Sequence, residues 1–137
     1  MLSVQSSRLR PDEVPRKPSS CHHDLVDSSI VEPWRAAVFV HLRIRVAEHR
    51  QAELRSFLSE AIPFYESPGG IRVRLLANDL DPERFIELVE YIDEHTYRQD
   101  ESRVESDPTM AAFLVRWRSL LVEPPCVEVY HQTDLAH

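Results

Sequence analysis

Two kinds of hydrophobic repeat alternate along the chain after residue 35. Between residues 36 and 45, apolar side chains occupy every second position, which is typical of a strand with one buried face. Between residues 54 and 65, apolar side chains recur at intervals of three and four, which is typical of an amphipathic helix. The pattern therefore predicts a strand followed by a helix. In the strand, one face carries Val38, Val40, Leu42 and Ile44, and the other carries Phe39, His41, Arg43 and Arg45.

The two glycines of the chain stand together at the end of this helix. Gly69 and Gly70 follow Pro68 and precede a second alternating run, residues 71–76. Glycine enters left-handed backbone conformations without steric cost, so the pair predicts a tight reversal. Residues 78–82 have turn chemistry and lead into a third alternating run. Two such strands with a short connection predict an antiparallel hairpin.

The last third of the chain predicts a broken helix and a final strand. Asp93 is expected to cap a helix that is charged through Asp107. Pro108 is well tolerated as the first residue of a helix, so we expect a break and a restart there. The restarted helix has an apolar stripe that includes Met110 and Trp117, both interpreted as core residues. Two prolines end it, and residues 126–130 predict the last strand.

The order strand, helix, strand, strand, helix, strand predicts an α+β, ferredoxin-like βαββαβ fold. In that fold, a four-stranded antiparallel sheet carries its helices on one face. In the third strand, we expect Ile86, Leu88 and Ile92 to point toward the helices. The opposite face is too apolar to be left in water, so we expect a second copy of the chain to cover it. It is predicted to carry Phe39, His41, Arg43, Arg72, Arg74, Glu87, Val89, Tyr91, Glu128 and Tyr130.

Composition limits the domain organisation. The chain has 137 residues, of which 42% are hydrophobic, enough for one packed domain. We predict a flexible N-terminal tail over residues 1–33 and a single domain over 34–137. Within the tail, residues 21–24 read Cys-His-His-Asp but lack the spacing of a zinc site, so no metal is predicted.

Charge and apolar runs exclude several classes of partner. The net charge is −7 and the basic residues are scattered, which argues against nucleic-acid binding. No apolar run is long enough to span a membrane, and no secretory signal is apparent. The two cysteines, Cys21 and Cys126, lie far apart in the sequence, and a structural disulfide is not expected. The sequence therefore predicts a cytoplasmic protein without membrane or nucleic-acid partners.

Four segments together resemble a known family, the dimeric α+β barrel superfamily, and within it the antibiotic-biosynthesis-monooxygenase-like proteins. They are residues 38–44, 61–70, 85–91 and 93–94, and the resemblance extends over about residues 36–131. It implies a homodimer whose two sheets close into a barrel. It also implies oxidation of polycyclic phenolic substrates by molecular oxygen without metal or flavin, although other branches cleave heme and many have no known reaction.

The chain departs from the oxidising branches at the residues that position substrate there, an asparagine, a tryptophan and often a histidine. Its only asparagine, Asn78, lies in a predicted turn. Trp117 belongs to an apolar helix stripe, and His95 stands among charged residues. The resemblance thus predicts the fold more firmly than the reaction.

The candidate catalytic residues are His41 and Tyr91. His41 could act as a base on a phenol because the ordinary pKa of histidine is near neutrality, or it could be a partly solvated strand residue. Tyr91 and Tyr130 could stack on an aromatic ligand and donate a hydrogen bond, or they could line the barrel as packing residues.

The candidate substrate-binding residues are arginines, a glutamate and two aromatic residues. Guanidinium groups in a cavity could stabilise developing negative charge, or they could form a lattice of ion pairs with Glu87 and Glu128 across neighbouring strands. The set is Phe39, Arg43, Arg72, Arg74, Glu87 and Tyr130.

Three functions follow from these residues and the resemblance. The first is a small monooxygenase without a cofactor, acting on an aromatic or polyketide-like substrate in the barrel cavity. The second is a non-catalytic homodimeric module that binds a small ligand or serves in assembly. The third is a relative that binds or degrades heme, for which His41 is the best ligand by position. The sequence leaves open whether the protein is an enzyme.

Overall fold

The computed structural model describes residues 34–135. The predicted tail, with its Cys-His-His-Asp segment, lies outside the described residues, as do positions 136 and 137. The elements in chain order are β1 (Val38–Arg45), a short 3₁₀ helix η2 (Glu48–Arg50), α2 (Gln51–Tyr65), β2 (Ile71–Ala77), β3 (Arg84–Tyr91), α3 (Glu94–Ser106), α4 (Pro108–Ser119) and β4 (Cys126–His131).

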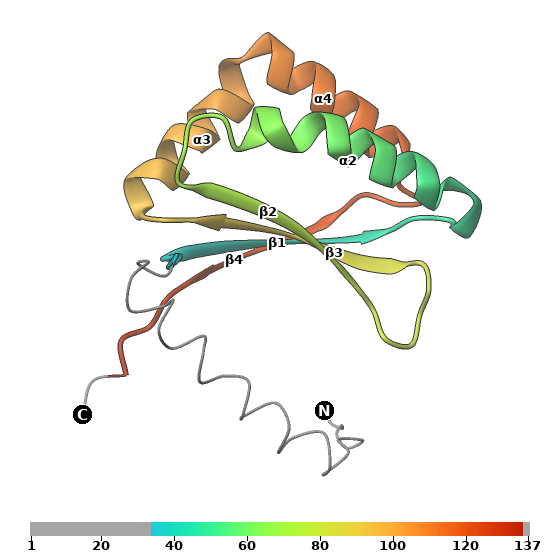
Figure 1. Ribbon diagram of the computed structural model, residues 1–137, viewed down its shortest axis with the longest axis horizontal. Helices are drawn as coiled ribbons and strands as arrows, with labels where there is room; N and C mark the ends of the chain where they lie inside the picture. Colours follow the sequence, from blue (N-terminus) through green and yellow to red (C-terminus); the bar gives the residue numbers. More distant parts are fainter. Residues whose placement is uncertain (1–33, 136–137) are drawn as a thin grey trace, which may run out of the picture. The chain divides into compact units, whose positions relative to one another are not determined.

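The four strands form one antiparallel sheet in the order β2-β3-β1-β4. Helices α2, α3 and α4 lie on the same side of this sheet (Figure 1). We call that side the helix-covered face and the opposite side the second face. The arrangement confirms the predicted ferredoxin-like α+β fold with its helices on one face.

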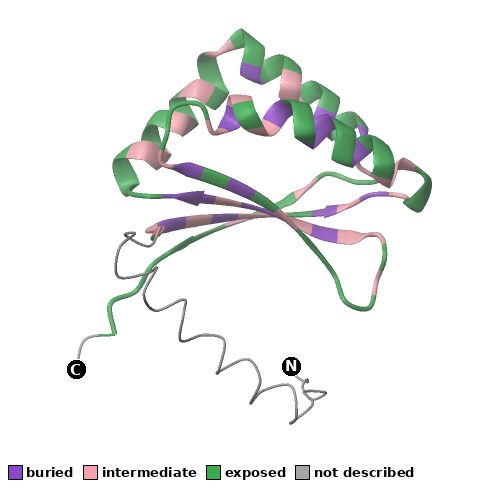
Figure 2. Cartoon of the chain, viewed as in Figure 1, coloured by how far each residue is buried: buried purple, intermediate pink, exposed green. Residues whose placement is uncertain are grey.

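The core lies between the helix-covered face and α2. The apolar stripe of α2 is buried, with Leu54 and Ala61 fully inaccessible to solvent. It packs in the same cluster as Val38 and Ile44 of β1. Figure 2 shows buried positions along the inward side of α2 and the central strands, whereas the edge strand β4 is exposed over most of its length. Burial of these side chains is the main stabilising contribution of the domain.

Gly69 and Gly70 form the predicted reversal between α2 and β2. Both have positive φ, +91° and +75°. At Gly70 the carbonyl oxygen accepts a hydrogen bond from Ile92 N at 2.9 Å, and a Cβ there would lie 2.8 Å from Ile92 Cγ2. A Cβ on Gly69 would meet no atom within 4 Å. The reversal therefore needs glycine at both positions for backbone reasons, and at Gly70 for packing as well.

The second helical segment begins at the predicted cap, Asp93, and breaks before Pro108 as predicted, while the cap of its second half, Asp107, is a finding of the structure. Asp93 caps α3, accepting a hydrogen bond from Thr96 N at 2.8 Å. Asp107 caps α4, accepting from Thr109 N at 2.8 Å, and Pro108 is the first residue of α4. Each cap satisfies a backbone N–H that a helix start would otherwise leave without a partner.

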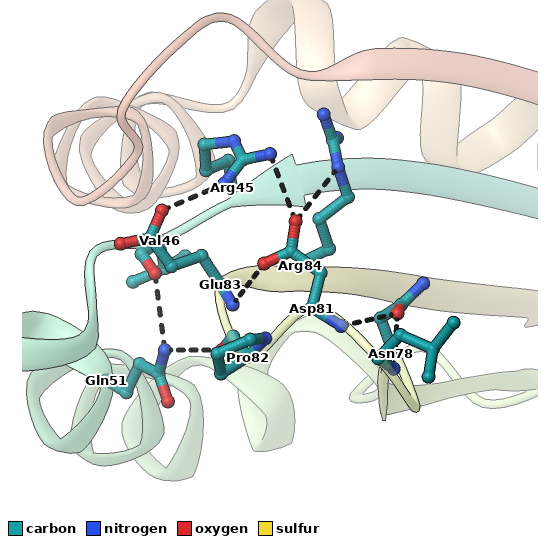
Figure 3. Close-up of polar contacts among 9 residues, drawn as sticks. Arg45, Val46, Gln51, Asn78, Asp81, Pro82, Glu83 and Arg84 are labelled. Atoms are coloured by element: carbon teal, nitrogen blue, oxygen red, sulfur yellow. Dashed lines mark hydrogen bonds and ion pairs between the residues drawn. The ribbon is translucent and has the colours of Figure 1, made fainter.

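The loop between β2 and β3 is tied to the end of β1 and the start of α2 (Figure 3). Arg45 forms ion pairs with Glu83 at 2.8 Å and with Asp81 at 3.2 Å. Gln51 donates to the carbonyl oxygen of Pro82 at 2.7 Å. These contacts fix the end of the hairpin opposite to the Gly69–Gly70 reversal, and they hold β3 against β1.

The structure corrects the predicted face of β3. Pairing of Val38 with Tyr91 and of Leu42 with Glu87 places Tyr91, Val89 and Glu87 on the helix-covered face. Ile86 and Leu88 lie on the second face, so the sequence prediction was wrong for this strand. β3 is a central strand with apolar residues on both faces, and the alternation of its sequence does not distinguish the two.

The other strands have the predicted orientation. Registers of β1 with β4 and of β2 with β3 place the remaining residues of the predicted set on the second face. These residues are Phe39, His41, Arg43, Arg72, Arg74, Glu128 and Tyr130.

We predict that Gly70→Ala is more destabilising than Gly69→Ala. Both substitutions force a Cβ into a positive-φ conformation, but only the Gly70 variant also pushes against Ile92. Expected losses in the free energy of unfolding are about 3 kcal/mol for Gly70→Ala and about 1 kcal/mol for Gly69→Ala. Urea denaturation of the two variants checks the order, and equal losses would contradict the role given to the Ile92 contact.

Candidate functional site

A cavity of about 360 Å³ lies between the helix-covered face of the sheet and helices α3 and α4. This volume lies in the range of small-molecule sites. Most of the wall is apolar, and its polar residues are Glu87, Trp117 and the tyrosines Tyr65, Tyr91 and Tyr97, together with Asp100, Glu101, Glu105 and Arg118. The apolar wall consists mainly of Val40, Leu42, Ile71, Val73, Val89, Val104, Met110, Leu114, Val127 and Val129.

The cavity lies where apolar packing between α3 and β4 is weak, although His131 of β4 contacts Glu94 of α3 at 3.2 Å. Among residues 94–106 of α3, none is buried. Val127 and Val129 of β4 belong to the helix-covered face by register, yet they remain 55% and 40% exposed. The space under α3 is therefore left unfilled by core side chains, and it opens beside the edge strand β4.

Glu87 is the most unusual group in the wall. Its side chain sits between Leu42 and Leu75 on the neighbouring strands, and only 3% of the residue is exposed. Within the described residues, its Oε1 has no hydrogen-bond partner. Burial raises the pKa of the carboxyl group from 4.5 to about 7. Glu87 is thus a carboxyl group that exchanges its proton near neutral pH.

Trp117 of α4 approaches Glu87 from the helix side. The indole N–H acts on the carboxyl group in the direction that lowers its pKa, but burial outweighs it. Nε1 is buried, and its contact with Glu87 falls outside ordinary hydrogen-bond geometry, so among the described residues it has no hydrogen-bond partner. A buried acceptor and a buried donor in the same wall are both available to a ligand.

Tyr91, Asp100 and Arg103 form a polar chain along the wall. The Tyr91 hydroxyl donates to Asp100 Oδ2 at 2.6 Å, and Arg103 Nη2 forms an ion pair with Asp100 Oδ1 at 3.0 Å. Arg103 also donates to the carbonyl oxygens of Phe64 and Tyr65 at 3.1 and 2.7 Å, at the C-terminal end of α2. Burial and the Asp100 charge raise the pKa of Tyr91, so its hydroxyl keeps its proton.

Of the residues proposed from the sequence, the structure places two in this cavity, Glu87 and Tyr91. His41, Phe39 and Tyr130 lie on the second face, on the opposite side of the sheet. There the rings of His41 and Tyr130 are 4.9 Å apart between centroids. The structure therefore does not bring His41 and Tyr91 together.

The arginines proposed for substrate binding are also on the second face. Arg43 forms an ion pair with Glu128 at 3.5 Å, and Arg74 forms one with Glu90 at 2.8 Å. Arg72 pairs in register with Glu90 across the strands. Arg43 and Arg74 thus have the geometry of the ion-pair lattice, the second of the two alternatives.

Three wall or support residues were not singled out as functional from the sequence. Trp117 was interpreted as core, and its burial agrees, but its N–H lacks a partner. Asp100 and Arg103 lie in a charged helix that gives no signal of its own. A signal was available for Glu87, which is one of two glutamates, with Glu90, in the otherwise apolar run of β3.

Metal ligands do not cluster in the part of the chain that the structure describes: no group of three or more His, Cys, Asp or Glu side chains there could hold a metal ion. Likewise, none of the helices between residues 34 and 135 has the length and apolar character needed to cross a membrane.

Comparison with known proteins yields structural relatives. No family model matches the chain, and no curated protein matches it. Its fold resembles that of SnoaB, a cofactor-independent oxygenase from Streptomyces nogalater, with a TM-score of 0.59 at 16% identity over 75% of this chain and 100% of that one. A conserved protein from Methanosarcina mazei gives a TM-score of 0.61 at 17% identity, covering 72% and 94% of the two chains.

A protein from Caulobacter crescentus, named as a candidate antibiotic biosynthesis monooxygenase, gives a TM-score of 0.60 at 11% identity. It covers 79% of this chain and 98% of that one. The chain therefore has the fold of the antibiotic-biosynthesis-monooxygenase-like proteins, and the resemblance seen in the sequence is confirmed at the level of the fold.

We predict that Glu87→Gln stabilises the protein in a pH-dependent way. The folded-state pKa of about 7 lies above the ordinary value of 4.5, so the wild type is most stable while this carboxyl group is protonated. Its stability relative to Glu87→Gln should fall as the pH rises from about 4.5 to about 8, by about 3 kcal/mol in the free energy of unfolding.

Urea denaturation of both proteins at several pH values measures this difference in the free energy of unfolding. The contributions of the other titrating groups are common to both proteins and cancel. The exposed residue Glu48, which does not line the cavity, gives the matched control Glu48→Gln, measured in the same way. A pH-independent difference for Glu87→Gln would show that this carboxyl group titrates normally.

Proposed function

We propose that this protein is a cofactor-independent monooxygenase that binds a small aromatic or polyketide-like molecule in the cavity beneath α3 and α4. The observation that carries the proposal is the buried Glu87, whose pKa of about 7 suits a general base at neutral pH. Support also comes from the fold, which SnoaB, a cofactor-independent oxygenase, shares at 16% identity.

In the proposed reaction, Glu87 accepts a proton from an activated C–H group of the substrate. The resulting carbanion transfers its electrons to molecular oxygen, and a C–O bond forms at the same carbon. Glu87 returns its proton to the outer oxygen, which gives a hydroperoxide. The second hydrogen of the same carbon then leaves as a proton while the O–O bond breaks, so that a carbonyl group forms, one oxygen atom stays in the substrate, and the other leaves as water. Molecular oxygen is the oxidant and the substrate is the reductant.

The surroundings of Glu87 have distinct proposed roles. The Trp117 N–H donates to oxygen on which negative charge develops, since a preorganised donor in an apolar site stabilises such charge strongly. Tyr91 keeps its proton and is held by Asp100, so it is a positioning residue in the wall. The apolar side chains exclude water from the carbanion.

We propose further that two copies associate through their second faces. This face carries exposed apolar area, including Leu76 at 42% and Tyr130 at 49% exposure, together with the ion pairs of Arg43 and Arg74. Such a mixture of apolar groups and paired charges is typical of an interface. His41, one of the predicted catalytic residues, would then lie at the interface, and we assign it no part in the reaction.

The second candidate function is a non-catalytic homodimeric module that binds a small ligand. It is favoured by one observation: the Tyr91 hydroxyl is already committed to Asp100 at 2.6 Å, so it is not available as an acid or base. Heme binding through His41 has less support, because His41 lies on the opposite side of the sheet from the cavity.

We predict that the protein consumes oxygen with a hydroxylated anthrone, an aromatic compound with an acidic methylene group. Glu87→Gln should lower the rate at least about 100-fold, because a lost general base typically costs that much. The rate should rise with pH to a plateau above about 7, as the carboxylate forms. An oxygen electrode measures both effects.

Glu48→Gln, outside the cavity, is the control for the oxygen measurement and should keep the wild-type rate. Turnover that survives Glu87→Gln would remove Glu87 from the reaction. Ligand binding without oxygen consumption in any sample would favour the non-catalytic module.

Native mass spectrometry should give twice the mass of one chain. Leu76→Glu places a charge on the second face and should shift the protein toward monomer. The matched change Val115→Glu, at a 65% exposed position of α4 on the helix side, should leave the dimer intact. A monomeric wild type, or equal loss of dimer in both variants, would contradict association through the second face.

A further inference from the structure

The charges around the cavity are unevenly distributed. Four acidic residues line it, Glu87, Asp100, Glu101 and Glu105, whereas Arg118 is the one basic residue in the wall among residues 34–135. Two of the four carboxylates have cationic partners outside the wall. Arg103 pairs with Asp100 at 3.0 Å, and Arg98 pairs with Glu101 at 3.0 Å.

Apart from these two pairs, the wall contains two carboxyl groups, those of Glu87 and Glu105, and one guanidinium group, that of Arg118. Arg118 and Glu105 are exposed, so both lie where the cavity meets solvent. Glu87 lies in the buried part of the wall. The buried part of the cavity thus contains an acceptor without a partner and no cation, and its charge is zero or negative.

We propose that the natural ligand of this cavity is an apolar molecule that presents a hydrogen-bond donor, and no negative charge, to Glu87. This inference rests on the proposed use of the same cavity as the substrate site, and it specifies the chemistry that the site accepts. A hydroxyl group and a protonated amine share this donor chemistry.

Such a ligand complements the buried wall in both hydrogen bonding and charge. A buried acceptor without a partner is costly, and a donor on the ligand removes that cost. A hydroxyl group can in addition accept from the Trp117 N–H, and an ammonium group supplies the cation that the buried wall lacks. A carboxylate ligand would instead bring a second negative charge to Glu87 without a basic side chain beside it, which is strongly unfavourable in an apolar cavity.

The test uses three probes with one apolar body: 2-naphthylmethanol, 2-naphthylmethylamine and 2-naphthoate. Isothermal titration calorimetry on the full chain at about pH 8 gives their dissociation constants. The alcohol or the amine should bind at least about tenfold more tightly than the carboxylate. The tighter binder of these two probes shows whether the donor is a hydroxyl group or a protonated amine.

Substitution shows whether Glu87 is responsible for the preference. Glu87→Gln keeps the shape of the side chain and removes its charge, so it should weaken the preferred donor probe about fivefold or more and narrow its advantage over 2-naphthoate. Glu48→Gln should leave all three constants unchanged. The circular dichroism spectrum and urea midpoint of each variant confirm that it is folded.

Two results would overturn the inference: 2-naphthoate binding as tightly as both donor probes, or a preference for donors that Glu87→Gln does not alter. Oxygen consumption is measured separately, so the two proposals fail independently. Selective binding of a donor probe with no turnover of any anthrone would preserve this inference and remove the monooxygenase. Turnover of a carboxylated substrate would preserve the monooxygenase and remove this inference.

Discussion

The hydrogen bond from Tyr91 to Asp100, completed by Arg103, is the interaction on which the cavity depends. It joins three elements: β3 through Tyr91, α3 through Asp100 and Arg103, and the end of α2 through two carbonyl oxygens. The guanidinium group also lies over the ring of Phe64, 4.8 Å from its centroid. No residue of α3 is fully buried, and this polar chain acts together with the ring contact between Tyr97 and Tyr91, 5.2 Å between centroids, in holding the helix over the sheet. The space beneath it remains open as a result.

Glu87 occupies its buried position at a cost in stability. Its strand neighbours are leucines, and an apolar residue of similar volume would satisfy the packing without an orphaned oxygen. A carboxyl group in such a place is typical of functional positions, where desolvation shifts a pKa toward neutrality.

The sequence was sufficient to predict the helices and strands, but it was not sufficient to predict the candidate site. The caps at Asp93 and Asp107 and the glycine reversal are local, and each could be read from a few neighbouring residues. The face of β3 depends on its register with β1, which the sequence of a central strand with apolar residues on both faces does not reveal. The same holds for Trp117, whose helical repeat indicates burial but not what its N–H meets. Contacts such as Arg103 with Tyr65, 38 positions apart, exist only once the fold is formed.

The weak apolar anchoring of α3 has a consequence for motion. A helix without buried side chains loses little apolar burial when it detaches, so its opening costs less free energy than that of α2, which buries five residues. Amide protons of α3 should accordingly exchange with solvent faster than those of α2, and by local opening instead of global unfolding. Since α3 forms one wall of the cavity, which already meets solvent beside β4, each such opening widens this mouth, and a molecule bound beneath α3 can leave at least as often as the helix detaches.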